Sequence, residues 1–483
     1  MGSVIVEKLG NLVNSLFQTD DSPGAKLLNR VLLMILYIFG AVIWIRFLNF
    51  GSIPDDRLDW ADITFPRLQV IQQAVQQGEL PLYYSIKEIG LLDVTNLFLS
   101  IPDQIFSPDV FLLNTFTIQE FVVAHILIFY SFGFWALINL KKKFSLSFFG
   151  FIPLFLLFNF NGHIVSHLSV GHLTWASYFL LPFFFDLILD LFSNKKIDMR
   201  WVTKISFLLF LMFLSGGYHH FVWCLFFLSM SFLVSKDKKY VFYSMVFSVL
   251  INMVRILPAA LLSNNLDIEF MVGFPTSTTL IEGFVGNYLP ESSYFPVQNK
   301  VNVLVWEFNY YLGIIGIIFV IFFSINYFQK HWNEDIHRIL FPVFSLLFLS
   351  IGNIYKPLFD SGLPFFSGER VSSRFLIMVI LPLFIISVMR YQEILNKANS
   401  KYIKFGLVVG TFLLANDLIQ HTNYWNVGEV INVFPPGLKA VQYSIVAGKN
   451  VIYESLLIIG LIITLLSTIF LTMLFVHKKH KPS

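Results

Sequence analysis

The sequence has few charged residues and almost no cysteine. Only 13% of its 483 residues are Asp, Glu, Lys or Arg, whereas soluble globular proteins carry about 25%. The single cysteine, Cys224, has no partner in the chain, which excludes an internal disulfide and a four-cysteine zinc site. These shortages exclude a disordered protein, a secreted disulfide scaffold and an ordinary soluble enzyme.

Hydrophobic residues dominate instead, at 56% of the chain, and 17% of the chain is aromatic. Crossing about 30 Å of hydrocarbon takes about 20 apolar residues, and runs of that length recur throughout. They predict an all-α polytopic membrane protein with about twelve transmembrane helices, within a range of about ten to thirteen. The expected spans lie near residues 30–49, 117–140, 144–161, 173–193, 204–218, 219–235, 241–262, 309–328, 339–354, 374–390, 404–420 and 451–476.

Basic residues concentrate in alternate loops, and the positive-inside rule places such loops in the cytoplasm. The pattern therefore predicts a multi-pass protein of the cytoplasmic membrane with both termini cytoplasmic. No basic stripe interleaved with aromatic residues indicates nucleic-acid binding. The basic loop positions are Lys141, Lys142, Lys143, Lys195, Lys196, Arg200, Lys204, Lys236, Lys238, Lys239, Lys330, Arg338, Arg390, Lys397, Lys401 and Lys404, followed by Lys478, Lys479 and Lys481 in the tail.

The expected organisation is one membrane domain over residues 30–476, a cytoplasmic segment over 1–29 and a cytoplasmic tail over 477–483. The amphipathic stretch 5–17 is interpreted as an interfacial helix rather than a partner-docking segment. No cleavable signal peptide is expected, because the first apolar run is too long and starts too late. Four partly helical outer loops are expected, at 50–116, 263–308, 355–373 and 421–450.

The first outer loop carries a cluster of carboxylates. Asp55, Asp56, Asp59 and Asp62 lie close together around Trp60. Solvation of the loop would explain one such residue, but four together favour a functional role. A partly desolvated carboxylate is a better general base, because burial raises its pKa toward neutral pH. Carboxylate pairs also bind divalent cations, so Mg²⁺ or Mn²⁺ is left open as a cofactor, although no metal ligand is assigned.

Histidines gather at the expected outer ends of the spans. On a helix, His163 and His167 would share one face. A zinc site is disfavoured, because no glutamate lies between them and no third ligand is evident. Two readings stay open: hydrogen bonding to an anionic substrate, or interfacial histidines satisfied by the backbone. The six histidines are His163, His167, His172, His219, His220 and His421.

An arginine pair lies at the start of the tenth expected span. Arg370 and Arg374 are one helical turn apart, close to Gly368 and two serines. Two guanidinium groups at a helix N-terminus suit a phosphate group. The alternative is a pair that extends to lipid headgroups. Arg255, near the outer end of the seventh span, is a weaker candidate for the same anion.

Several ionisable residues lie inside the expected spans. Charged groups within a membrane are costly and often functional, so a secondary transporter stays among the interpretations. These residues are His125, Asp186, Asp190, Asp417 and Glu454.

A series of short motifs, taken in order, resembles the GT-C superfamily of integral-membrane glycosyltransferases, and most closely its bacterial branch. The resemblance covers about residues 30–390. No Asp-Glu or Asp-x-Asp signature singles out one carboxylate, and a large soluble C-terminal domain is lacking. The motifs are Asp59 before Phe65-Pro66; Gly78-Glu79-Leu80-Pro81-Leu82-Tyr83; Gly162-His163, Gly171-His172, Trp175 and Leu181-Pro182; Gly216-Gly217-Tyr218-His219-His220; Glu307 to Gly313; and Arg370 to Phe375.

The resemblance implies transfer of a sugar from a polyprenyl-phosphate-linked donor to an unknown acceptor at the outer face of a bacterial cytoplasmic membrane. It implies an inverting displacement with Asp59 as the base and Asp62 as the alternate. The expected phosphate-binding residues are Arg370, Arg374, Arg255, His172 and His219. The expected substrate-binding residues are Asp55, Asp56, His163, Glu307 and Tyr83.

Two other functions compete with the transferase. One is an inactive GT-C-like scaffold subunit within a membrane protein complex, and the other is a secondary transporter. The expected partners are the lipid-linked donor, membrane lipids, the acceptor and, for the scaffold, other membrane proteins.

Overall fold

The computed structural model describes residues 14–18, 22–87, 94–101, 103–193, 195–263, 269–286, 294–295, 303–363, 366–397, 401–433 and 442–477. Most of the interfacial helix expected at residues 5–17, and nearly all of the tail, lie outside these residues. The described chain is mainly helical, which confirms the all-α expectation.

Eight helical segments of the described chain are long and apolar enough to cross a membrane. They are α2 (Pro23–Phe47), α4 (Ile118–Lys143), α5 with α6 (Phe148–Phe160 and Gly162–Ser169), η5 with α7 (Leu173–Leu180 and Leu181–Leu191), η7 with α13 (Val305–Phe308 and Gly313–Lys330), η10 with α16 (Ser372–Phe375 and Leu376–Lys397), α17 with α18 (Lys401–Tyr424 and Val427–Val433), and α19 (Val451–His477).

The expected count of about twelve spans is not confirmed. Helices α10 (Lys238–Leu250) and α11 (Met253–Ser263) meet at a bend of 67° and would give a ninth span if they cross together. Three helices at expected spans are shorter: α8 (Met199–Leu214), α9 (Tyr218–Val234) and α14 (Leu340–Leu349). A helix as short as α14 rises only about 15 Å, half the hydrocarbon thickness.

Local sequence explains several helix ends. Thr117 and Glu120 form a reciprocal capping box at the start of α4, which ends in three lysines that suit the helix dipole. The side chain of Asn161 accepts a hydrogen bond from the backbone N–H of Ile164 and starts α6 directly after α5. The two helices together make one span with a break at Asn161.

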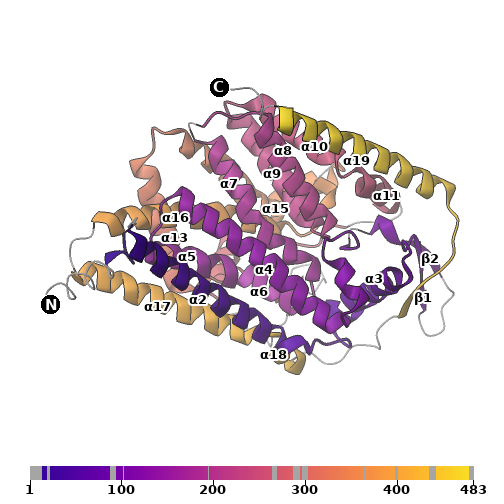
Figure 1. Cartoon of the computed structure of the whole chain (residues 1–483), viewed down its shortest axis with the longest axis horizontal. Helices are drawn as coiled ribbons and strands as arrows, with labels where there is room; N and C mark the ends of the chain where they lie inside the picture. Colours follow the sequence, from indigo (N-terminus) through magenta and orange to yellow (C-terminus); the bar gives the residue numbers. More distant parts are fainter. Residues whose placement is uncertain are drawn as a thin grey trace.

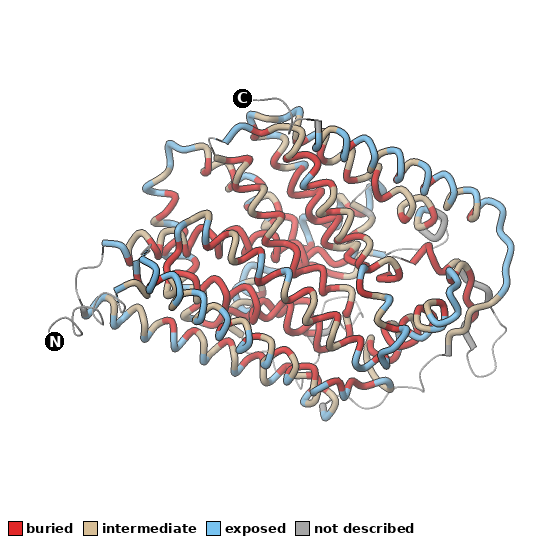
Figure 2. Tube along the Cα trace, viewed as in Figure 1, coloured by how far each residue is buried: buried red, intermediate tan, exposed pale blue. Residues whose placement is uncertain are grey.

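Burial separates a core of helices from a lipid-facing shell. The spans that contain α5, α7 and α16 are mostly buried, whereas only 17% of the apolar span is buried in each of α2, α17 and α19 (Figure 2). A helix that is apolar on its exposed face needs a lipid environment, so these three helices support a membrane protein.

The expected outer loops contact one another, and α3, β1 and β2 of the first of them lie at the right of Figure 1. Strands β1 (Tyr83–Lys87), β2 (Val94–Leu97) and β5 (Gln442–Ile445) form an antiparallel sheet in the order β2-β1-β5. This sheet joins the first outer loop to the fourth. A parallel bridge from Val272 to Val371 joins the second to the third, and one from Phe274 to Ile351 joins the second to the end of the expected span 339–354.

Short elements complete this end. They are η1 (Asn49–Gly51), η2 (Trp60–Thr64), α3 (Phe65–Gln77), η3 (Phe98–Ser100), η4 (Val110–Asn114), α12 (Ser277–Val285), β3 (Tyr294–Phe295), β4 (Val303–Leu304), α15 (Gly352–Asp360) and η9 (Phe366–Gly368).

Ion pairs tie the expected cytoplasmic loops together at the other end of the bundle. Lys143 pairs with Asp186 and Asp190 at 2.5 and 2.7 Å, and Lys330 pairs with Glu393 at 2.7 Å. Lys236 likewise pairs with Asp335, just before η8 (Asp335–Ile339). Asp186 and Asp190, which had kept a transporter in consideration, are therefore partners of a lysine.

Candidate functional site

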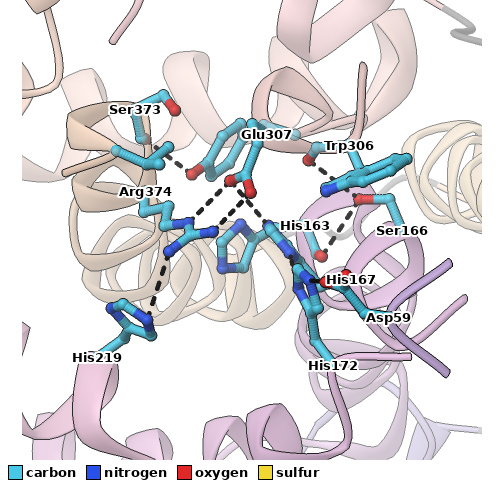
Figure 3. Close-up of polar contacts among 12 residues, drawn as sticks. Asp59, His163, Ser166, His167, His172, His219, Trp306, Glu307, Ser373 and Arg374 are labelled. Atoms are coloured by element: carbon cyan, nitrogen blue, oxygen red, sulfur yellow. Dashed lines mark hydrogen bonds and ion pairs between the residues drawn. The ribbon is translucent and has the colours of Figure 1, made fainter. Parts of the chain in front are cut away.

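The outer-loop end of the bundle contains a cavity of about 200 Å³. Five of the residues predicted for the site line it, although they come from distant parts of the chain. They are Asp59, His172, His219, Arg370 and Arg374. Figure 3 shows four of them, with Asp59 beside His172 and Arg374 beside His219.

The backbone around Asp59 is unusual. Leu58 has a φ of +56°, a conformation that is uncommon for a residue with a side chain. Trp60 to Thr64 then form a π-helical turn, η2, directly after Asp59. Such turns and strained residues are found often at functional sites. Asp62 lies within the same turn, but among the four clustered carboxylates Asp59 is the one that lines the cavity.

Gly171 holds this turn against the segment that carries His172. The Thr64 hydroxyl donates a hydrogen bond to the Gly171 carbonyl at 2.5 Å, and the Trp60 indole donates to the Ser169 carbonyl at 2.9 Å. Gly171 has a φ of +108°, and a Cβ atom there would lie 2.4 Å from the Trp60 nitrogen. The close approach therefore requires glycine at this position.

His172 connects Asp59 to the buried interior. Its Nε2 atom lies 2.5 Å from Asp59 Oδ2, and its Nδ1 atom lies 2.8 Å from Nδ1 of His167. The His167 ring stacks on Trp175, with 3.7 Å between ring centroids. Its Nε2 atom lies 3.8 Å from Glu307 Oε2. His163 and His167 share one face of α6, as their spacing predicts.

The electrostatics keep Asp59 ionised. Burial opposes ionisation, but the hydrogen bond and charge of His172, with the charges of Arg374 and Arg67, outweigh it and lower the pKa of Asp59 below its usual value. This direction is opposite to the one that burial alone predicts. Desolvation and the charge of Asp59 raise the pKa of Asp62, which is exposed and does not line the cavity.

Arg374 is a buried cation with two carboxylate partners. Its Nε and Nη2 atoms donate to Glu307 at 2.8 and 2.6 Å, and its Nη1 atom lies 3.6 Å from Glu369. The guanidinium lies over the Trp175 ring, 5.3 Å from the centroid. Glu307 was predicted to bind substrate, but it is buried and committed to Arg374.

Glu369 is a site residue that the sequence interpretation missed. It is fully buried and accepts hydrogen bonds from the Trp223 indole at 2.8 Å and the Val371 backbone at 3.1 Å. Its Oε2 atom lies 2.8 Å from His219 Nδ1. Burial opposes ionisation, yet His219 and Arg374 lower the pKa of Glu369 to about 2. Its place directly before Arg370, beside a predicted phosphate clamp, was the available signal.

Arg370 differs from Arg374 in its surroundings. It is exposed and lines the cavity, and no carboxylate in the described chain forms an ion pair with it. The expected α-helical turn is not found here, because α16 begins at Leu376 and Arg374 belongs to the 3₁₀ helix η10. The two arginines still reach one cavity, so Arg370 is the cation available to a ligand.

Two predicted residues lie away from the cavity. Arg255 is buried in α11, and its guanidinium donates to the carbonyls of Leu99, at 2.9 Å, and Ile101. It therefore supports loop backbone rather than a phosphate group. The Tyr83 hydroxyl donates to Glu454 at 2.7 Å, within the contact between β1 and the start of α19.

The other predicted substrate residues do not line the cavity either. Asp55 is exposed, and Asp56 pairs with Arg57 at 2.8 Å. His163 is buried and stacks on Tyr310, with 4.8 Å between ring centroids.

Arg67 and Asp103 complete the polar part of the cavity wall. Arg67 donates to Asp103 at 3.3 Å, and both residues line the cavity. Arg67 directly follows the Phe65-Pro66 motif, which could have drawn attention to it, whereas nothing in the sequence marks Asp103.

Two carboxylates, Asp59 and Asp103, belong to the cavity wall. Within the described part of the chain, no group of three or more His, Cys, Asp or Glu side chains is arranged to hold a metal ion. In the cavity wall, Asp59 is bonded to His172 and Asp103 to Arg67. Neither of these two carboxylates is paired with the other, and no metal ligand is assigned here.

Comparisons of the chain with protein-family models, with curated proteins and with solved structures found no match. The case for a function therefore depends on the geometry of the cavity and on the motifs that led to it.

Proposed function

We propose that the chain is a GT-C-type membrane glycosyltransferase that uses a polyprenyl-phosphate-linked sugar. The observation that carries the proposal is the cavity that brings an ionised carboxylate, Asp59, together with an available cation, Arg370. Displacement at an anomeric carbon needs both groups: a base for the acceptor hydroxyl and a positive charge for the leaving phosphate.

In this proposal Asp59 is the catalytic base. Its Oδ2 atom is bonded to His172, and in the described chain Oδ1 has no hydrogen-bond partner. Oδ1 accepts the proton of the acceptor hydroxyl while the hydroxyl oxygen attacks the anomeric carbon. The bond from that carbon to the phosphate oxygen breaks, and its electron pair leaves with the polyprenyl phosphate. Attack from the opposite face inverts the configuration.

Arg370 and His219 stabilise the negative charge of the departing phosphate. Arg374 acts as a positioning group, because Glu307 and Glu369 already compensate its charge and its Nη1 atom lies 3.4 Å from His219 Nε2. His172 is likewise reassigned from phosphate binding to the orientation of Asp59. No step requires a metal ion.

The proposed setting is a cytoplasmic membrane with both termini inside and the cavity outside. Two features support it: the basic loops are ion-paired to one another at one end of the bundle, and the cavity lies at the other. A secondary transporter is disfavoured, since its site would lie near mid-depth between two repeats.

The test uses the full-length protein in micelles with a panel of undecaprenyl-phosphate-linked hexoses and pentoses, and follows release of undecaprenyl phosphate. We expect release of undecaprenyl phosphate from one donor class. We also expect Arg370→Gln to weaken binding of undecaprenyl phosphate by about tenfold, because the variant loses a charged hydrogen bond. Arg338→Gln, at the opposite end, is the control. If no donor is turned over and undecaprenyl phosphate does not bind, the scaffold interpretation replaces this proposal.

A further inference from the structure

A second cavity lies at the basic end of the bundle between α2 and α4, and Ser15, Gln18 and residues 145–148 also line it. Its volume is about 730 Å³. The two helices touch where the Tyr37 hydroxyl lies 2.8 Å from the Ser131 hydroxyl and where the Tyr130 hydroxyl donates to the Tyr37 carbonyl at 2.9 Å. The groove lies between this contact and the ends of the helices, which run in opposite directions.

On each helix the side chains that line the groove change from basic to apolar in the same direction. The spacing places the lining residues of each helix on one face. Going from the end of the bundle toward the contact at Tyr37, basic residues come first and apolar residues follow. On α2 these are Lys26, Asn29, Arg30, Leu33, Met34 and Tyr37, and on α4 they are Lys142, Lys141, Ile138 and Phe134.

Two of the basic groups are available to an anion. In the described chain neither Arg30 nor Lys142 has a carboxylate within ion-pair distance, whereas the neighbouring Lys143 has two partners, Asp186 and Asp190. Lys141 donates to the Leu146 carbonyl at 2.7 Å. As far as the chain is described, the groove lining includes four basic side chains and no acidic one.

We infer that this groove binds an anionic phospholipid, with its phosphate against Arg30 and Lys142 and one acyl chain along Leu33, Met34 and Phe134. A basic rim above an apolar wall, on helices that cross the membrane, matches the two parts of such a molecule. A free phosphate compound shares the headgroup chemistry, but it would leave the apolar wall unused. This inference does not depend on the proposed transferase activity.

The first test measures lipid retention by native mass spectrometry of the full-length protein in micelles. Phosphatidylglycerol is compared with phosphatidylcholine of the same chain length. We expect the double variant Arg30→Gln/Lys142→Gln to lower phosphatidylglycerol binding by at least about tenfold and to leave phosphatidylcholine unchanged. The control is Lys238→Gln/Lys239→Gln, whose amino groups lie over the rings of Phe232 and Tyr243, outside the groove. Unchanged phosphatidylglycerol preference in the first variant would overturn the inference.

The second test separates a lipid from its headgroup. Met34 and Ile35 are adjacent on α2 and similarly exposed, at 57% and 54%, but only Met34 lines the groove. We expect Met34→Trp to lower phosphatidylglycerol binding several-fold by filling the apolar wall, and Ile35→Trp to have no effect. Glycerol 3-phosphate that displaces the lipid at equal concentration would show a headgroup-only site and refute the lipid assignment.

Discussion

Nε2 of His172 lies 2.5 Å from Oδ2 of Asp59, and the backbone around both residues is built to keep them together. The π-helical turn after Asp59 and the glycine before His172 fit against each other so closely that each constrains the other. This pairing distinguishes Asp59 from the other three clustered carboxylates, and Asp59 is also the one of the four that lines the cavity.

Asp59→Asn should abolish sugar transfer. The amide cannot accept the proton of the acceptor hydroxyl, and loss of a general base costs about 100-fold to 10,000-fold in rate. Asp55→Asn, at an exposed position outside the cavity lining, should keep full activity. Release of undecaprenyl phosphate measures the rate, and gel filtration of both variants checks that they fold. Wild-type rates in Asp59→Asn and in Asp62→Asn would refute the assignment of either carboxylate as the catalytic base.

His172→Gln should shift the acid limb of the pH–rate profile upward. His172 lowers the pKa of Asp59, so the base is ionised above that pKa and activity is lost as pH falls through it. Without the imidazole the pKa of Asp59 rises, and activity is lost at a higher pH. The profile of kcat/KM measures this shift. A control variant, His331→Gln, at the opposite end, should leave the limb in place, and an unshifted limb in His172→Gln would contradict the assigned pairing.

Glu369→Gln should destabilise the fold. Removing one partner of a buried ion pair typically costs about 3–5 kcal/mol. Asp360→Asn, which removes the exposed pair with Lys356, should cost less than about 1 kcal/mol. Thermal unfolding in micelles compares the two variants, and equal Tm values would show that Glu369 is not a structural anchor.

The same carboxylate predicts a pH dependence of stability. The pKa of Glu369 is lowered from 4.5 to about 2 in the folded protein. Its stabilisation is therefore complete above the unfolded pKa and is lost as pH falls from 4.5 to about 2. The Tm of wild type should fall over this range more steeply than the Tm of Glu369→Gln.

Gly171→Ala should reduce activity without removing the fold. A Cβ atom at Gly171 would meet the Trp60 backbone nitrogen at 2.4 Å and displace the turn that carries Asp59. Gly78 also has a positive φ, +68°, but no heavy atom lies within 4 Å of its Cβ position. Gly78→Ala should therefore show only the strain of the left-handed backbone, about 1–2 kcal/mol in unfolding free energy, with unchanged activity. Equal activity in the two variants would contradict the role of the close approach.

Sequence alone predicted which side chains would share a cavity better than it predicted their roles. Asp59, His172, His219, Arg370 and Arg374 could be found because scarce polar residues recur at one set of helix ends. The hydrogen bonds and ion pairs of these residues could not be predicted, because burial of a partner such as Glu369 depends on tertiary packing.

The expected count of about twelve spans stays unconfirmed for a different physical reason. The helices α8, α9 and α14 are shorter than the about 20 residues that a full crossing takes, and α8 ends where the turn Ser215-Gly216-Gly217 begins. Hydropathy does not report where a helix ends. Arg255 shows the same limit at a single residue, because its carbonyl partners come from a loop more than a hundred residues away.

The pairing of β5 with β1 has a consequence for the order of assembly. Tyr84 of the first outer loop lies in register with Ile445, near the end of the chain. During synthesis the edge of β1 stays open until the segment before α19 has been made. The sheet that holds the first outer loop is thus completed late, after Arg374, the last residue of the cavity wall, has already been made.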